Sequence, residues 1–210
     1  MNRLEITIST FDKYADHYQE KYMKYEPYIE TYRYLSSLLK ADAEILDVAC
    51  GPGNISKFLL EEKPQLRVQG IDLSPQMINL ARLNNPTAVF EIRDSREILS
   101  LKKTFDAIVA GFFLPYLSRD EVSQFIINVR AILRSGGIFY ISTMEGDYKN
   151  SGYQSNNNLD RVYIYYFQEK FLLEQLKLAG FEIVRINRKP FELNGGSKEA
   201  VDLFIYARAC

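Results

Sequence analysis

Three groups of residues in this sequence could bind a nucleoside-like ligand, and each group follows a short apolar run. Gly51 and Gly53 form a turn after the run at 44–49, where glycines let the backbone approach a ligand and the next helix N-terminus favours negative charge. Asp72 ends the second run, and a carboxylate there can accept hydrogen bonds from both hydroxyls of a ribose. Asp94, after the third run, offers a further acceptor beside the place of a base. The alternative is that Asp72 and Asp94 only cap the helices that follow them.

These groups can lie together only if the apolar runs are strands of one parallel sheet. Short strand-like runs alternate with helical segments along the chain, which is typical of βαβ units. Strands are predicted at 44–49, 66–71, 88–92, 105–110, 138–142, 181–188 and 201–207. Helices are predicted in the N-terminal segment through Tyr22, from Pro27 to about Lys40, and at 55–62, 75–84, 95–101, 119–134 and 171–179. Helix starts are indicated at two serines. Ser74 is followed by Pro75, which suits the first helical position, and Ser118 is followed three residues later by Glu121, as in a capping box.

The last two predicted strands are joined by a turn-rich segment and not by a helix, so they should pair antiparallel at the edge of the sheet. The predicted fold is a doubly wound, Rossmann-like α/β fold. Its seven-stranded sheet is mostly parallel with the last strand antiparallel, helices cover both faces, and extra helices precede the first strand. We predict one domain over 1–210. Within it we expect a helical cap (1–40), a cofactor-binding core (41–143), a substrate lid (144–166), and a C-terminal helix and hairpin (167–210).

The composition excludes several classes of protein. Lysine and arginine number 26 against 27 aspartates and glutamates, so the electrostatic footprint of a nucleic-acid-binding protein is missing. No apolar run has the length of a membrane span. The two cysteines cannot form a disulfide framework, which favours a reducing compartment. We therefore predict a cytoplasmic protein, monomeric or homodimeric, with a small-molecule substrate and without a nucleic-acid partner, membrane contact or metal site.

Five segments occur in a fixed order along the chain: 45–54 (ILDVACGPGN), 70–77 (GIDLSPQM), 105–110 (FDAIVA), 133–137 (LRSGG) and 179–182 (AGFE). In this order they resemble the glycine-rich first motif, the second motif, the fourth-strand motif, and the turns before the fifth and sixth strands of the class I S-adenosylmethionine-dependent methyltransferases. The resemblance covers about residues 10 to 208.

The resemblance implies an enzyme that binds S-adenosyl-L-methionine. The backbone of 49–53 would face the methionine part of this cofactor, with Asp47 near its ammonium group, while Asp72 would hold the ribose and Asp94 the adenine amino group. Cys50 could instead only fill a small space beside the turn. The implied cofactor-binding residues are Tyr18, Asp47, Ala49, Cys50, Gly51, Gly53, Asp72, Leu73, Met77, Asp94, Ser95, Ala110 and Gly111.

The expected reaction moves the cofactor's methyl group to an oxygen or nitrogen atom of a small molecule. Because the sulfonium already activates the methyl group, alignment and desolvation can suffice for catalysis, and no clear base is present. His17 is the one candidate base that we name. Candidate substrate contacts are Tyr14, Tyr116, Arg161, Tyr163 and Tyr165. Two alternatives stay open, a non-catalytic cofactor-binding protein and a nicotinamide-dependent oxidoreductase. The oxidoreductase is disfavoured by Ser56, which stands at a position of the glycine motif, and by Asp47.

The chain is rich in tyrosine and phenylalanine, 15 and 13 residues, and has no tryptophan. Many of these residues fall at 11–34 and 163–171. Two interpretations are open for them. They either provide ordinary packing, including an edge strand with exposed tyrosines, or they line a pocket for a small, flat acceptor.

Overall fold

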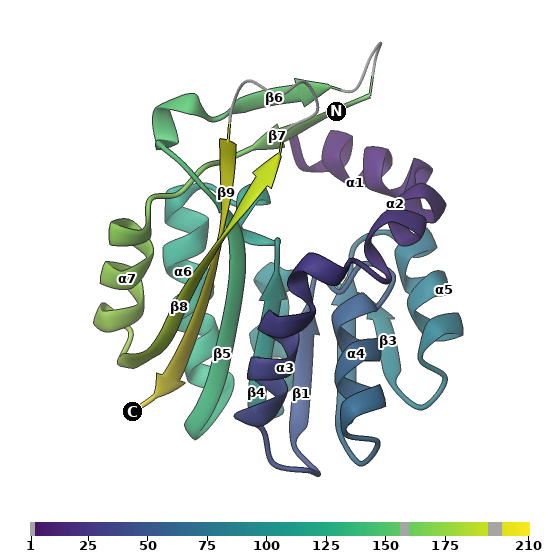
Figure 1. Cartoon of the computed structure of the whole chain (residues 1–210), viewed down its shortest axis with the longest axis vertical. Coiled ribbons are helices and arrows are strands. Elements are labelled where there is room, and N and C mark those ends of the chain that lie inside the picture. Colours follow the sequence, from purple (N-terminus) through teal and green to yellow (C-terminus); the bar gives the residue numbers. More distant parts are fainter. Residues whose placement is uncertain (1–2, 156–159, 193–198) are drawn as a thin grey trace.

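The computed structural model describes residues 3–155, 160–192 and 199–210. Within this part of the chain, seven strands form one sheet in the order β3-β2-β1-β4-β5-β9-β8 (Figure 1). The strands are β1 (Glu44–Val48), β2 (Arg67–Asp72), β3 (Val89–Ile92), β4 (Phe105–Gly111), β5 (Leu133–Glu145), β8 (Phe181–Glu192) and β9 (Glu199–Ala209). β1 to β5 are parallel, whereas β9 pairs antiparallel with both β5 and β8. The predicted fold is confirmed, with β9 inside the sheet and β8 at its edge.

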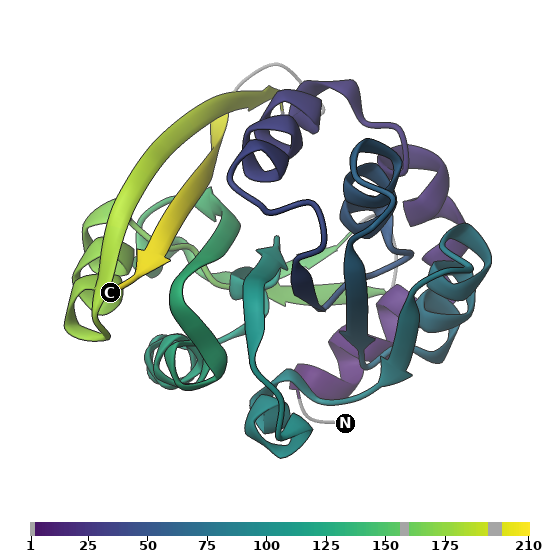
Figure 2. The same ribbon diagram turned by 90° about the horizontal axis from the view of Figure 1, so that it is seen from below.

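Helices cover both faces of this sheet (Figure 2). On one face lie α3 (Ile29–Ser37), α4 (Asn54–Glu62) and α5 (Pro75–Asn84). The other carries α6 (Arg119–Ile132), α7 (Glu169–Leu178) and the 3₁₀ segment η2 (Ser95–Leu101). Apolar residues recur every three or four positions, as Val122, Phe125 and Val129 do in α6, so each helix buries one face against the strands. The predicted N-caps are confirmed: the hydroxyl of Ser74 accepts a hydrogen bond from the Met77 amide, and Ser118 forms a capping box with Glu121.

The fifth strand is longer than its predicted range of 138–142. Residues 133–137 were expected to be a turn because of Gly136 and Gly137. In the structure they are the irregular start of β5, where the pairing with β4 shifts between Phe105 and Ala107. A pair of glycines ends a helix and opens a bulged strand equally well, so the local pattern did not separate the two.

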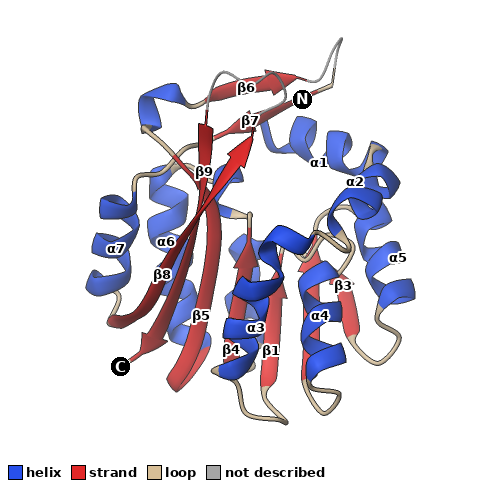
Figure 3. Ribbon diagram, viewed as in Figure 1, coloured by secondary structure: helices blue, strands red, loops and turns tan. Residues whose placement is uncertain are grey.

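The N-terminal segment differs from the single helix predicted there. α1 (Arg3–Lys13) and α2 (Ala15–Tyr22) are separated at Tyr14, whose backbone leaves the helical region at φ −107°. A 3₁₀ turn, η1 (Glu26–Tyr28), begins beside Pro27 and leads into α3. α1 and α2 lie at the end of the sheet toward which β1 and β4 point (Figure 3).

The segment predicted as a lid contains a second, two-stranded sheet. β6 (Gly152–Ser155) and β7 (Arg161–Ile164) pair antiparallel after the 3₁₀ turn η4 (Tyr148–Asn150). This small sheet lies beside α1. The Thr10 hydroxyl donates a hydrogen bond to the Arg161 carbonyl, and Lys13 forms a 2.6 Å ion pair with Asp160. Another 3₁₀ turn, η3 (Leu114–Tyr116), follows β4. Its Pro115 carbonyl accepts a hydrogen bond from the amide of Tyr165, the residue directly after β7.

The Ser118 cap can be tested by unfolding. Ser118→Ala should lower the free energy of unfolding by about 1 kcal/mol, because the capping box loses its side-chain acceptor at the start of α6. Ser123→Ala is the matched control, since that hydroxyl lies within the same helix and bonds only the preceding turn. Urea denaturation of both variants measures the difference, and an equal effect of the two would contradict the assignment.

Candidate functional site

A cavity of about 110 Å³ lies where β1, β2, β3 and β4 end, beneath α1. It is mostly apolar, with polar groups at its strand-tip side. The lining residues are Leu4, Thr7, Ile8, Phe11, Tyr18, Ala49, Gly51, Asp72, Leu73, Ser74, Met77, Arg93, Ser95, Gly111, Phe112, Phe113 and Tyr116. Most of the predicted cofactor contacts are therefore brought together, namely Tyr18, Ala49, Gly51, Asp72, Leu73, Met77, Ser95 and Gly111.

The turn after β1 is tied to the end of β2 by one carboxylate. Asp72 Oδ2 accepts a hydrogen bond from the Gly51 amide at 3.0 Å, and Oδ1 accepts one from the Ser74 amide at 2.9 Å. Burial raises the pKa of Asp72, opposed by these hydrogen bonds. Gly51 itself has a left-handed backbone, φ +54°, and a side chain here would point at Tyr18 and Met77, so glycine keeps this part of the turn open to the cavity. Asp72 thus starts the next helix and also lines the cavity.

Asp94 follows the capping alternative. Its carboxylate accepts a hydrogen bond from the Arg96 amide at 2.9 Å and forms an ion pair with the Arg96 guanidinium. Asp94 does not line the cavity, although its two sequence neighbours, Arg93 and Ser95, do. Arg93 was missed by sequence reasoning, because an arginine after a strand has no distinctive signal. Its Nε is buried without a hydrogen-bond partner among the described residues, while its terminal nitrogens bond Ser100 and Glu91.

The remaining predicted cofactor residues do not line the cavity; they are Asp47, Cys50, Gly53 and Ala110. Asp47 is buried and accepts a hydrogen bond of 2.6 Å from the Ser56 hydroxyl. Desolvation by burial raises the pKa of Asp47 to about 7. The Cys50 side chain packs against Ile78, Ala81 and Phe90, away from the cavity, which agrees with a space-filling role. Gly53 and Ala110 are likewise outside the lining.

α1 covers the cavity. The resemblance implied an N-terminal helix over the site at residues 11–18, but it did not single out Leu4, Thr7 and Ile8 as lining residues. Leu4, Ile8 and Phe11 recur at helical spacing, and this pattern was the available signal. Asp12 Oδ1 anchors the helix, because it accepts hydrogen bonds from the Ser74 hydroxyl at 2.7 Å and from the Gln76 amide at 2.9 Å. The same helix contacts the β6–β7 sheet on its other side.

Two further cavities adjoin the first, and Tyr18 and Tyr116 line all three. The second, about 430 Å³, lies between α1, α2 and the β6–β7 sheet, and Tyr14 and His17 line it. The third, about 140 Å³, lies between α2, η1 and the ends of β5 and β9. The backbone of Phe112 at the end of β4 is left-handed, φ 51°, a strained conformation that is common at functional sites.

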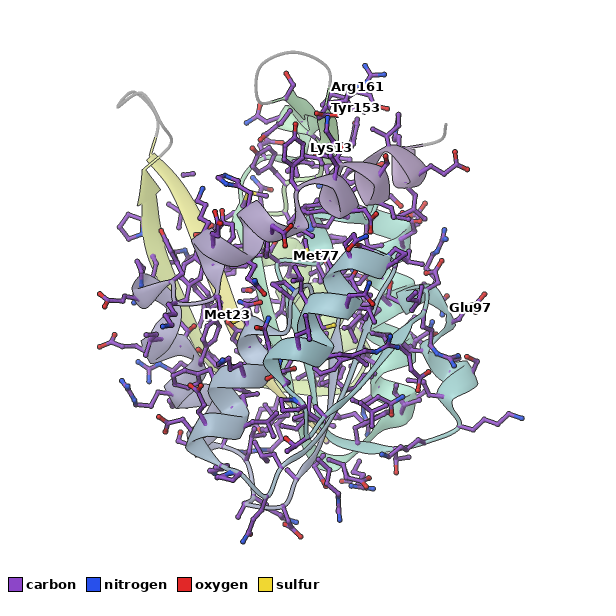
Figure 4. The ribbon with its side chains drawn as sticks, turned by 90° about the vertical axis from the view of Figure 1, so that its right-hand side faces the viewer. Lys13, Met23, Met77, Glu97, Tyr153 and Arg161 are labelled. Atoms are coloured by element: carbon purple, nitrogen blue, oxygen red, sulfur yellow. The ribbon has the colours of Figure 1, made fainter. Side chains whose placement is uncertain are left out.

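Three predicted substrate residues are engaged elsewhere. The guanidinium of Arg161 lies 4.2 Å from the centre of the Tyr153 ring, and Figure 4 shows this pair together on the small sheet, apart from Met77 on α5. Arg3 of α1 lies 4.3 Å from the Tyr163 ring and donates a 2.9 Å hydrogen bond to the Tyr165 hydroxyl. None of Arg161, Tyr163 and Tyr165 lines the three cavities: the Arg161 side chain packs within the small sheet, whereas Tyr163 and Tyr165 contact Arg3 of α1.

Comparisons with known proteins agree with this geometry. Residues 45–137 match the family model described as "Methyltransferase domain". The chain is 26% identical over 169 residues to the tRNA N(3)-methylcytidine methyltransferase trm141 of Schizosaccharomyces pombe, which covers 71% of this chain and 68% of that protein. It is 31% identical over 109 residues to a malonyl-[acyl-carrier protein] O-methyltransferase of Halalkalibacterium halodurans, covering 49% and 40%. The chain spans between 40% and 68% of the length of the first curated relatives that it matches.

A solved S-adenosylmethionine-dependent methyltransferase from Methanosarcina mazei superposes with a TM-score of 0.72 at 23% identity, over 84% of this chain and 96% of that one. The two chains therefore share their fold. In the part of this chain that the structure describes, no helix has the length and apolar character needed to cross a membrane. The same residues contain no cluster of His, Cys, Asp and Glu side chains that could hold a metal ion.

The raised pKa of Asp47 makes stability depend on pH. An ordinary aspartate ionises near 3.9 in the unfolded chain and Asp47 near 7 in the folded one, so the folded state binds the proton more tightly. Stability should therefore fall as the pH rises from about 4 to 7, by about 4 kcal/mol at this one site. In Asp47→Asn this part of the pH dependence should disappear.

Urea denaturation across this pH range measures the effect. Asp42→Asn, which changes an exposed carboxylate before β1, serves as the control and should keep the wild-type pH dependence. If Asp47→Asn and Asp42→Asn respond to pH alike, burial of Asp47 is not the cause.

Proposed function

The chain carries a class I S-adenosylmethionine-dependent methyltransferase domain, and we propose that the protein transfers a methyl group from this cofactor to an oxygen or nitrogen atom of a small molecule. The observation that carries the proposal is the joining of the Gly51 turn and the Asp72 carboxylate in one cavity with Leu73, Met77 and Ser95. This cavity lies at the strand ends where such sheets bind nucleosides.

The residues fit an adenosyl group. Asp72 presents a half-buried carboxylate whose oxygens can accept from both ribose hydroxyls, and Leu73 and Met77 provide apolar walls for a flat base. Asp94 can accept from the adenine amino group only if Arg96 yields part of its ion pair. The left-handed turn from Ala49 to Gly51 leaves room for the methionine part of the cofactor.

The cofactor supplies a methyl group that positive sulfur already activates. In the transfer, a lone pair of the acceptor forms the new bond to the methyl carbon, while the electrons of the sulfur–carbon bond return to sulfur. A proton then leaves the acceptor to a base or to water. The task of the protein is to align these atoms and exclude water, which the aromatic rings of Phe11, Tyr18 and Tyr116 favour at the junction of the cavities. His17 lines the second cavity, where it could take that proton.

We propose a small acceptor for two reasons. The net charge of −1 gives no support to binding of a polyanion, although one relative is named as a tRNA methyltransferase. Next to the cofactor cavity lie two cavities, one between α1, α2 and the small sheet and one between α2, η1 and the ends of β5 and β9, and these fit a compact molecule. Cys50 and Cys210 are free thiols, which supports a cytoplasmic location.

Binding of S-adenosylhomocysteine tests the cofactor site. Asp72→Asn should weaken the affinity about tenfold to a hundredfold, because a charged acceptor of the ribose hydroxyls becomes a neutral amide. Isothermal titration calorimetry measures this effect, and thermal unfolding shows whether the turn stays intact. Asp16→Asn, an exposed change on α2, should leave the affinity unaltered. Equal affinities for wild type and Asp72→Asn would refute the ribose assignment.

Methyl transfer itself is tested with radiolabelled cofactor and a panel of small metabolites. Transfer of label to at least one small acceptor is expected. Binding of the cofactor without any transfer would favour a non-catalytic cofactor-binding protein, and transfer only to a macromolecule would refute the small acceptor.

The cover formed by α1 generates a kinetic prediction. The cavity of about 110 Å³ is smaller than the several hundred Å³ of usual ligand pockets, so we expect α1 to move outward when the cofactor binds. Asp12→Ala removes the acceptor that fixes α1 to the start of α5, and dissociation of S-adenosylhomocysteine should become several-fold faster. Stopped-flow displacement measures this rate. Ser9→Ala, on the exposed side of α1, should not change it; an Asp12→Ala rate equal to wild type would show that α1 does not gate the site.

A further inference from the structure

The third cavity contains a buried carboxylate among aromatic rings. Asp202 of β9 is only 2% exposed and stands opposite Met144 in the pairing of β9 with β5. Both residues line the cavity, together with Asn54 and rings from α2, η1, α3 and the end of β4. Asp202 is therefore a charged group in a space that is otherwise mainly apolar. Sequence reasoning did not single it out.

The structure gives this carboxylate no positive partner among the described residues. Its hydrogen-bond partner is the hydroxyl of Tyr28, which donates to Oδ2. Lys189 stands opposite Asp202 on β8 but forms an ion pair of 3.7 Å with Glu30. No lysine or arginine lines the cavity in the part of the chain that the structure describes. Burial accordingly raises the pKa of Asp202, as expected for a desolvated carboxylate without a counter-charge.

The surrounding rings form a continuous wall that leads back to the cofactor cavity. Tyr28 stacks on Phe112 with ring centres 5.3 Å apart, and Tyr25 packs edge-on against Tyr28 at 4.7 Å. From there the wall continues through Tyr22 to Tyr18, whose ring centres are 4.6 Å apart. The faces of such rings attract cations, most strongly where water is excluded.

We propose that the third cavity binds the methyl acceptor through an amine group, held as an ammonium ion by Asp202 and the tyrosine wall, while a different oxygen or nitrogen atom of the same molecule receives the methyl group. The substrate class is then small organic molecules that carry an amine, and not carboxylic acids. This inference rests on the proposed methyl transfer, and it names the acceptor of that same site. An ammonium ion supplies the counter-charge that Asp202 lacks among the described residues, and it can donate hydrogen bonds to Oδ1 while Tyr28 keeps Oδ2.

An acidic acceptor would meet the opposite situation. Its carboxylate would lie against the carboxylate of Asp202 with no cation in the third cavity to separate them. Two relatives are named as malonyl-[acyl-carrier protein] O-methyltransferases, and the matches span only 40% and 47% of their own length, so their substrate is not transferred to this chain. The second cavity carries both Lys21 and Asp160, so it favours neither sign of charge. The selection therefore rests on Asp202.

Three probes of nearly equal shape test the inference: benzylamine, benzyl alcohol and benzoate. Each is titrated by calorimetry into the full-length protein saturated with S-adenosylhomocysteine. Benzylamine should bind at least about tenfold more tightly than benzyl alcohol, and benzoate should bind most weakly. In Asp202→Asn, which preserves shape, the preference for the amine should be lost. Lys189→Met is the matched control on the neighbouring strand and should keep the wild-type order.

A second variant covers the case in which Asp202→Asn does not fold. Tyr28→Phe keeps the ring but removes the hydroxyl that donates to Asp202, so benzylamine should bind at least as tightly as in wild type while benzoate stays weakest. The inference is overturned if benzoate binds as well as benzylamine, if the probes bind equally, if benzylamine does not bind, or if Asp202→Asn keeps the amine preference. Failure of S-adenosylhomocysteine to bind at all would instead contradict the proposed methyl transfer. Normal binding of S-adenosylhomocysteine without an amine preference would contradict this inference alone.

Discussion

The hydrogen bond from the Gly51 amide to the Asp72 carboxylate, 3.0 Å long, holds the turn after β1 against the end of β2. It is possible because β1 and β2 are adjacent and parallel, with Val48 level with Ile71, so both strands end at the same edge. The other oxygen of Asp72 fixes the start of α5 through the Ser74 amide. One carboxylate therefore ties the turn after β1 to the end of β2 and to the start of α5, and the cavity and its cover lie around it.

The sequence patterns were sufficient for this edge of the sheet. Gly51 and Asp72 each follow an apolar run directly, and parallel strands bring such residues together without further information. Asp94 shows where the reasoning becomes ambiguous, because a carboxylate before a helical turn can cap that turn or face a ligand, and both demand the same residue type. The structure resolves this competition through Arg96, two positions later, whose guanidinium holds the carboxylate in the cap.

Residues that act through long-range packing could not be predicted. The spacing of Leu4 and Ile8 indicates a helical face, but it does not say that this face closes a cavity formed by strands far away in the chain. Arg161 was expected to contact the substrate and instead stacks on Tyr153, a pairing that depends on the register of β6 and β7. Asp202 lies within an apolar strand, where a lone aspartate carries no local sign that it is buried.

The aromatic residues divide between the two interpretations that the sequence left open. Rings from the segment 11–34 line the three cavities, whereas Tyr163 and Tyr165 pack against each other and against Arg3. The difference follows from position: the first segment crosses the ends of the strands, and the second belongs to a hairpin beside α1. High aromatic content thus provides both the pocket wall and the packing that supports it.

α1 borders the first and second cavities at once, since Phe11 lines both. It is fixed to α5 beside the first cavity and to the small sheet beside the second. Outward displacement of this helix would open these two compartments together. The third cavity is not lined by α1, so exchange of the cofactor and exchange of the acceptor would depend on different elements of the fold.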